Sequence, residues 1–197
     1  ECLPSRGMDH VTEHCSSDGL GGIDRVILVH GFGAGPHDHW FPWLARSFRH
    51  VEVPRLPHPE SPDASTWAST IAERIGTSPD GLTGLAIVTH SLGGLTALRA
   101  IERVIACDSP ANGNGRHLAA FIAVAPFAQQ LPPTGEAELD HFLATGLEGF
   151  LDGASPGELR PLLGRTTVIH SDNDPLVPRA ASRRFATAIS ADVVTVP

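Results

Sequence analysis

The sequence lacks long apolar runs, and its basic residues are outnumbered by acidic ones. No run of apolar residues approaches the roughly 20 that a membrane-spanning helix needs, so no membrane span is predicted. Lysine and arginine together number 14 against 22 acidic residues, which gives a net charge of −8, and they are scattered along the chain. Because a phosphate backbone is bound by clustered positive charge, nucleic acid is not an expected partner.

Cysteine and methionine are also scarce. Cys2, Cys15 and Cys107 are odd in number and have neither the paired spacing of a zinc site nor a CxxC redox motif. This pattern predicts a reduced, cytoplasmic setting. Met8 is the sole methionine, and the residues before it contain no apolar signal-peptide core. We therefore expect Met8 to be the natural start of the chain.

The chain is long enough for one domain with a substantial core. Its 197 residues are 41% hydrophobic and 18% charged, which is typical of a globular protein. Residues 1–22 are polar and end in GLGG, so they are predicted to be a flexible lead-in. Residues 23–197 are predicted to form a single domain, in which the irregular stretch 128–165 forms a short helical lid.

Apolar strand-like runs alternate with helical patterns after the lead-in. The predicted strands are DRVILVHG, VEVPRLP, GLAIVTHS, HLAAFIAVAPF, TTVIHSD and VVTV. The predicted helices between them are DHWFPWLARSF, ASTWASTIAERI, SLGGLTALRAIERV and RAASRRFATAI. Continuously apolar strands separated by helices are buried on both faces. The sequence therefore predicts an α/β fold with a doubly wound, mostly parallel sheet flanked by helices.

The string VTHSLGG at residues 88–94 is the strongest chemical motif. A nucleophilic serine on a sharp turn between a strand and a helix has the pattern GxSxG, because the positions two before and two after it must be small. Here those positions are Thr89 and Gly93, so the first departs from glycine. The alternative is that Ser91 only caps the following helix. An apolar strand before Ser91 and a helix after it favour the nucleophile.

The string VHGFGAGPHDHW at residues 29–40 permits three interpretations. A dinucleotide-binding GxGxxG motif fails where Pro36 replaces the third glycine. A metal site at residues 37–39 is disfavoured because alternate side chains point apart, and solvated loop histidines are the default. The third interpretation is an oxyanion hole, in which the backbone N–H groups of Phe32 and Leu92 face the carbonyl oxygen of the substrate.

The string SDNDPLVP at residues 171–178 offers the acid of a catalytic triad. The acid orients a histidine and should come from the end of a strand near the nucleophile. Asp174 is the first candidate and Asp172 the alternative. Both carboxylates could instead only shape the turn before the next helix. The order of nucleophile and then acid is the order expected for a serine on a strand-to-helix turn.

The set VHGF, HWFPWL, VTHSLGG and SDNDPLVP resembles the compact serine hydrolases of the α/β-hydrolase fold, in the family that includes the retinoblastoma-binding serine hydrolase and bacterial YdeN. The resemblance runs from about Arg25 to the last residue and implies Ser91 as nucleophile and Asp174 as acid. The Leu-x-Cys-x-Glu string that would bind a retinoblastoma-type protein is absent, so that partner is not implied.

The resemblance also implies a catalytic histidine in the loop after the strand ADVVTVP, where this sequence stops at Pro197. We therefore expect a C-terminally incomplete hydrolase whose histidine lies just beyond Pro197, and a chain that is nearly inactive as written. The histidines weighed as substitutes lie in or beside strands, in the predicted lid or in the lead-in, and none has the expected position: His30, His90, His170, His141, His10 and His14.

The predicted function is hydrolysis of carboxylic esters, with thioesters and amides as further acyl substrates, through an acyl-enzyme on Ser91. His30, Gly31, Trp40 and Phe127 are predicted to line the substrate pocket. A small-molecule acyl substrate is the expected partner, with no cofactor and no metal, and the oligomeric state is left open. The alternative is a non-catalytic protein of the same fold that binds a partner or a small ligand.

Overall fold

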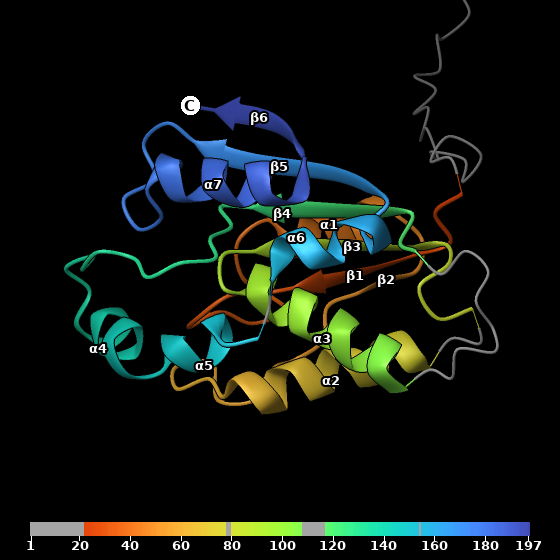
Figure 1. Ribbon diagram of the computed structural model, residues 1–197, viewed down its shortest axis with the longest axis horizontal. Coiled ribbons are helices and arrows are strands. Elements are labelled where there is room, and N and C mark those ends of the chain that lie inside the picture. The colour runs from red at the N-terminus through yellow and green to blue at the C-terminus, as the bar shows by residue number, and fades with distance from the viewer. Residues whose placement is uncertain (1–21, 78–79, 108–116, 154) are drawn as a thin grey trace, which may run out of the picture.

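The computed structural model describes residues 22–77, 80–107, 117–153 and 155–197 (Figure 1). The predicted lead-in at 1–22 falls almost entirely outside the described residues, as do Cys2, Cys15 and the histidines at 10 and 14. In the described part of the chain, no helix combines the length and hydropathy that a bilayer crossing demands.

Six parallel strands form one sheet in the order β2-β1-β3-β4-β5-β6. The strands are β1 Arg25–Val29, β2 Val51–Glu52, β3 Leu85–His90, β4 Ala120–Val124, β5 Arg165–Ser171 and β6 Asp192–Val196. The predicted doubly wound parallel sheet is therefore confirmed. The predicted strand at 51–57 shrinks to two residues, since Pro54 and Pro57 cannot donate to a strand ladder.

Helices follow the strands and cover both faces of the sheet (Figure 1). They are α1 Phe41–Ser47, α2 Ala64–Gly76, α3 Gly93–Cys107, α4 Ala137–Thr145, α5 Leu147–Leu151, α6 Pro156–Leu159 and α7 Arg179–Ile189, with a 3₁₀ turn η3 at Arg160–Leu162. The stretch 128–165, predicted as a lid, thus contains α4, α5, α6 and η3.

Two apolar clusters form the core, one on each face of the sheet. Because neighbouring side chains of a strand point to opposite faces, β1 contributes Ile27 and Val29 to the cluster beneath α2, α3 and α7. Its alternate residues Val26 and Leu28 join Phe41 of α1 in the second cluster. This double burial explains why the strand sequences are continuously apolar.

The direction of chain progression across the sheet reverses next to β1. The chain passes from β1 to β2 on one side, and then returns to β3 on the other side of β1 before continuing outward to β6. In open parallel sheets, ligands bind outside the carboxyl ends of the strands at such a reversal. The fold therefore directs attention to the loops that follow β1 and β3.

Candidate active site

Ser91 lies directly after β3, on the turn that leads into α3. Its φ angle is +53°, a left-handed conformation that a residue with a side chain adopts at a cost. The Ser91 N–H donates to the Val124 carbonyl of β4 at 2.9 Å, which anchors the turn to the sheet. The hydroxyl of Ser91 is thus presented from a rigid, strained position at the carboxyl edge.

The first residue of α3, Gly93, packs directly against β1. A Cβ atom at Gly93 would lie 2.2 Å from the Val29 carbonyl oxygen and 2.8 Å from that of His30, closer than atoms can approach. Only glycine therefore allows the helix to begin this close to the first strand. This contact is the physical reason for a glycine two positions after Ser91.

Thr89 occupies the position at which the usual pattern has a first glycine. Its side chain is fully buried, and its Oγ1 has no hydrogen-bond partner among the described residues. A Cβ atom at Gly94 would lie 3.7 Å from this oxygen, an ordinary van der Waals contact. The turn therefore holds a buried threonine where the usual pattern has glycine.

The loop after β1 lies against the turn that carries Ser91. A Cβ atom at Gly31 would lie 3.0 Å from the Ser91 Cβ and 3.5 Å from the Leu92 nitrogen. The backbone of this loop can therefore approach the nucleophile because residue 31 has no side chain. Phe32 follows, and both Phe32 and Leu92 line the same cavity as Ser91. These are the two residues predicted to supply the oxyanion hole.

The imidazole of His30 holds the loop after β1 in place through hydrogen bonds. The Leu56 N–H donates to His30 Nε2 at 3.2 Å, and Nδ1 lies 3.1 Å from the Gly31 carbonyl oxygen. Because Nε2 accepts, Nδ1 carries the proton and donates to Gly31. Burial lowers the pKa of His30, which favours this neutral form. The buried ring of His30 therefore holds the loop in place by hydrogen bonds.

Asp174 lies in the loop that follows β5. Its Oδ1 accepts hydrogen bonds from the N–H groups of Leu176 and Val177, each at 2.9 Å, so the carboxylate is held by its own turn. Asp172, the alternative acid, instead forms an exposed ion pair with Arg179 at 2.8 Å. The engagement of Asp172 with α7 makes Asp174 the better candidate.

His90 is enclosed by aromatic rings next to Ser91. Its ring centroid lies 4.8 Å from that of His39, 5.9 Å from Phe41 and 6.4 Å from Trp40. Burial lowers the pKa of His90 to about 4; the imidazole of His39 acts in the same direction, and the Asp174 carboxylate opposes them. His90 is therefore neutral at pH 7.

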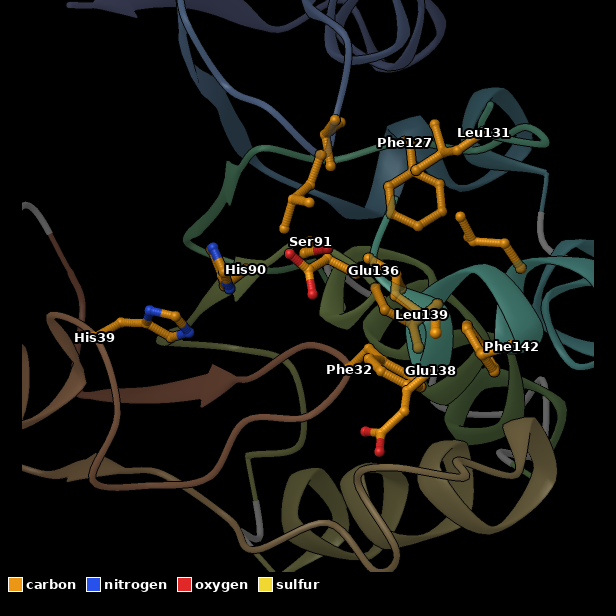
Figure 2. A pocket seen from close by; sticks show the side chains of 15 residues that line it. Phe32, His39, His90, Ser91, Phe127, Leu131, Glu136, Glu138, Leu139 and Phe142 are labelled. Carbon is orange, nitrogen blue, oxygen red and sulfur yellow. The ribbon is translucent and has the colours of Figure 1, made fainter. Parts of the chain in front are cut away.

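A cavity of about 520 Å³ opens beside Ser91. This volume is within the range of about 300–1,000 Å³ that is usual for small-molecule sites. The lining comes from the loops after β1, β3, β4 and β5 and from α4: Phe32, His39, His90, Ser91, Leu92, Phe127, Leu131, Glu136, Ala137, Glu138, Leu139, Phe142, Leu143, Leu176 and Val177 (Figure 2). Segments far apart in the sequence thus converge on one apolar chamber.

Three of the four residues predicted to line the pocket do not line this cavity. Phe127 does, whereas His30, Gly31 and Trp40 lie outside its lining. His30 is turned inward by its hydrogen bond to Leu56, and the ring of Trp40 packs on Phe41. This cavity therefore does not support the expectation that these three positions line a substrate pocket.

The sequence prediction expected the 128–165 stretch as a whole to wall an acyl pocket, but it named no residue of α4 as part of that wall. Leu139, Phe142 and Leu143 have the i, i+3, i+4 spacing of one helical face, and they supply much of the apolar wall. The string LDHFL carries this signal in the sequence. Glu136 and Glu138, at the start of the helix, add two carboxylates to the lining of the cavity.

Aromatic contacts connect α4 and α5 back to the loop after β1. Phe142 stacks on Phe32 with ring centroids 5.0 Å apart and meets Phe150 edge to face at 5.8 Å. Phe150 contacts Trp67 of α2 at 5.8 Å, and Trp67 contacts His30 at 5.5 Å. The series of rings therefore runs from Phe32 through α4, α5 and α2 and ends at His30, two residues before Phe32 in the chain.

Among the other histidines of the described chain, His39 lines the cavity with Ser91 and packs against His90, whereas His170 and His141 lie outside the lining. His170 is buried in β5, with Nε2 3.3 Å from the Thr195 hydroxyl, and His141 is exposed on α4 outside the cavity lining. His90 Nδ1 has no hydrogen-bond partner among the described residues, so it does not bond to Asp174. No group of three potential metal ligands is found in the part of the chain that the structure describes.

Comparison with known proteins identifies relatives of the whole fold. YdeN of Bacillus subtilis (strain 168), a protein named as a hydrolase, is 28% identical over 171 residues, which cover 85% of this chain and 80% of YdeN. The crystal structure of the B. subtilis ydeN gene product matches with a TM-score of 0.69 at 26% identity, covering 88% of this chain and 84% of that one.

A lipase-esterase related protein from Clostridium acetobutylicum ATCC 824 shares the fold, with a TM-score of 0.59 at 12% identity over 87% of this chain and 84% of its own. A profile of the serine hydrolase family matches residues 26–197, nearly the whole described chain. The chain therefore belongs to the serine hydrolase family and has the α/β-hydrolase fold.

Proposed function

We propose that the chain hydrolyses carboxylic esters through an acyl-enzyme on Ser91. The observation that carries this proposal is the strained position of Ser91, at a φ of +53°, on the wall of an apolar cavity and against Gly31. A strained backbone persists where the surrounding structure holds it, and such residues cluster at active sites. An apolar chamber beside the hydroxyl suits the acyl half of an ester.

In the proposed reaction, Ser91 Oγ attacks the ester carbonyl while its proton passes to a histidine that Asp174 orients. The N–H groups of Phe32 and Leu92 hold the negative oxygen of the tetrahedral intermediate. Collapse of the intermediate expels the alcohol, which takes the proton from the histidine. Water then attacks the acyl-enzyme by the same route, releasing the carboxylic acid and restoring Ser91.

We further propose that this histidine belongs to the loop after β6. Val196 at the end of β6 pairs with Ser171, and its carbonyl accepts the Asp172 N–H at 2.9 Å. The backbone leaving β6 therefore starts beside the loop that carries Asp174. Figure 1 shows β6 ending on the side of the sheet where α4 lies. A histidine there would stand between the acid and the cavity.

Imidazole rescue tests both parts of the proposal on the 197-residue chain. Loss of a triad histidine lowers turnover by up to about a million-fold, so hydrolysis of p-nitrophenyl butanoate should be close to background. Added imidazole should supply the missing base and accelerate the reaction. Ser91→Ala provides the background for direct attack by imidazole. An imidazole effect equal in both proteins would refute catalysis by Ser91, and fast hydrolysis without imidazole would refute the location of the base.

A further inference from the structure

The cavity beside Ser91 has walls of two different kinds. Most of its lining is apolar, but Glu136 and Glu138 belong to it, and no lysine or arginine is among the lining residues. His90 is neutral at pH 7 because its pKa is lowered to about 4. Apart from its histidines, the ionisable groups of the lining are therefore two carboxylates, on a chain whose net charge is −8.

Glu136 is directed at the nucleophile. Figure 2 shows its carboxylate extending toward Ser91, while the carboxylate of Glu138 extends away past Phe32. Glu136 is the N-cap residue of α4, yet its side chain makes no capping hydrogen bond. The side chain thus points into the cavity instead of closing the end of its own helix.

The turn before Glu136 is held firmly in place. Asp140 accepts hydrogen bonds from the backbone N–H of Thr134 at 2.6 Å and from that of Gly135 at 3.0 Å. The Asp140 N–H in turn donates to the Glu136 carbonyl at 2.8 Å. The start of α4 is therefore fixed on both sides of residue 136, which defines where its carboxylate can reach.

A negative charge facing Ser91 opposes the oxyanion of the proposed reaction and repels anionic substrates. A positive charge on the substrate would reverse both effects. We propose, resting on the function proposed above, that Glu136 is a specificity-determining residue that selects esters with an apolar acyl group and a cationic alcohol half. The acyl chain occupies the wall formed by Leu139, Phe142 and Leu143, and the cationic group pairs with Glu136.

The same geometry excludes anionic acyl donors. A phosphate or carboxylate on the alcohol or thiol half would approach Glu136 and Glu138 without any cation in the lining to balance it. Thioesters of phosphorylated carriers and esters formed on the hydroxyl of a hydroxy acid are therefore poor substrates in this proposal. The proposal therefore predicts that the cavity distinguishes ligands of equal size and shape by their charge.

The test is a binding measurement with three hexanoyl esters on the Ser91→Ala protein, which prevents turnover. Hexanoylcholine carries a positive charge, 3,3-dimethylbutyl hexanoate is its uncharged isostere, and 4-(hexanoyloxy)butanoate is anionic. We expect the cation to bind about three- to fivefold more tightly than the isostere, as for an ion pair with the exposed Glu136 side chain, and the anion more weakly than both. The preference should shrink as salt concentration rises.

Glu136→Gln and Glu138→Gln form a matched pair of variants, since each removes one carboxylate from the same cavity. Glu136→Gln should abolish the preference for the cation, and Glu138→Gln should retain most of it. Equal binding of cation and isostere before substitution, or equal losses in the two variants, would overturn the assignment of Glu136.

Fluorophosphonate labelling of the unsubstituted chain in the presence of imidazole separates this inference from the proposed function. Labelling at Ser91 without any charge preference in binding would reject the role of Glu136 and leave the hydrolase standing. A charge preference without labelling would reject the hydrolase and leave a cation-selective binding cavity.

Discussion

The rings of Phe32 and Phe142 stack with their centroids 5.0 Å apart and their planes 29° from parallel. Phe32 belongs to the loop that lies against Ser91, and Phe142 belongs to α4, more than a hundred residues later in the chain. Gly146 makes room for this contact, since a Cβ atom there would lie 2.7 Å from the Phe142 ring. The position of the proposed oxyanion donor thus depends on a helix of the 128–165 stretch.

Truncation of this contact should impair chemistry more than substrate binding. We expect Phe142→Ala to lower kcat for imidazole-dependent ester hydrolysis by about tenfold, because a loosened Phe32 N–H stabilises the oxyanion less. Phe142→Leu, which keeps most of the apolar volume, separates loss of the ring from loss of the cavity wall. A rise in KM with kcat unchanged would limit Phe142 to binding.

The strain at Ser91 should be measurable as stability. Replacing Ser91 by glycine removes the cost of a positive φ, so we expect the free energy of unfolding in urea to rise by about 1 kcal/mol while activity disappears. Ser190 ends α7 at the same φ of +53° and lies outside the cavity lining. Ser190→Gly should therefore stabilise the protein similarly without loss of activity. A destabilised Ser91→Gly protein would contradict a strained nucleophile.

Two glycines on helices should respond in opposite directions to alanine. Gly93→Ala forces a Cβ atom to within 2.2 Å of the Val29 carbonyl oxygen, so we expect a loss of at least about 2 kcal/mol in unfolding free energy and loss of activity. At Gly149 in α5 the nearest atom would be 3.7 Å away, an ordinary contact. Gly149→Ala should be neutral or stabilising by up to about 1 kcal/mol. Urea unfolding of both variants checks the contrast.

His90 should make stability depend on pH. Its pKa is lowered from 6.5 to about 4 by burial, so the folded state disfavours the charged form. The associated stability is present above pH 6.5 and is lost as the pH falls through the interval from 6.5 to about 4. The gap between the two pKa values corresponds to about 3 kcal/mol.

Urea unfolding from pH 7.5 to pH 4.5 measures this dependence. His30 has a pKa lowered by burial as well, so the difference between the unsubstituted chain and His90→Gln isolates the His90 contribution. We expect the variant to lose less stability on acidification. Parallel pH profiles of the two proteins would mean that His90 is not the group concerned.

The sheet could be predicted because its strands are buried on both faces. The continuously apolar runs RVILV and LAIVTH indicate buried strands by themselves, whatever segments flank them, and both are strands of the sheet. The turn at Ser91 was equally local, since a strand, a serine and the glycine at 93 are adjacent in sequence. The strand at 51–57 was predicted from its apolar pattern alone. Its prolines, which are also a local signal, limit the strand to two residues.

Much of the cavity lining could not be predicted, because it is set by contacts distant in sequence. His30 was expected at the pocket, but the Leu56 N–H, 26 residues away, turns its ring into the core. Glu136 belongs to an irregular stretch whose path over the sheet edge depends on the Phe32 stack and on the Asp140 hydrogen bonds. The identity of a single residue in such a stretch does not indicate which strand end its side chain will face.

The contact between Gly93 and the Val29 carbonyl also bears on how the protein acquires its reactivity. The turn at Ser91 is held by β1 through Gly93 and by β4 through the Val124 carbonyl, and these partners lie dozens of residues away on either side. During folding, Ser91 can be forced into its strained conformation only after three strands have come together. The geometry of the nucleophile therefore depends on the joint placement of β1, β3 and β4, and its chemical reactivity reports whether these three strands are in place.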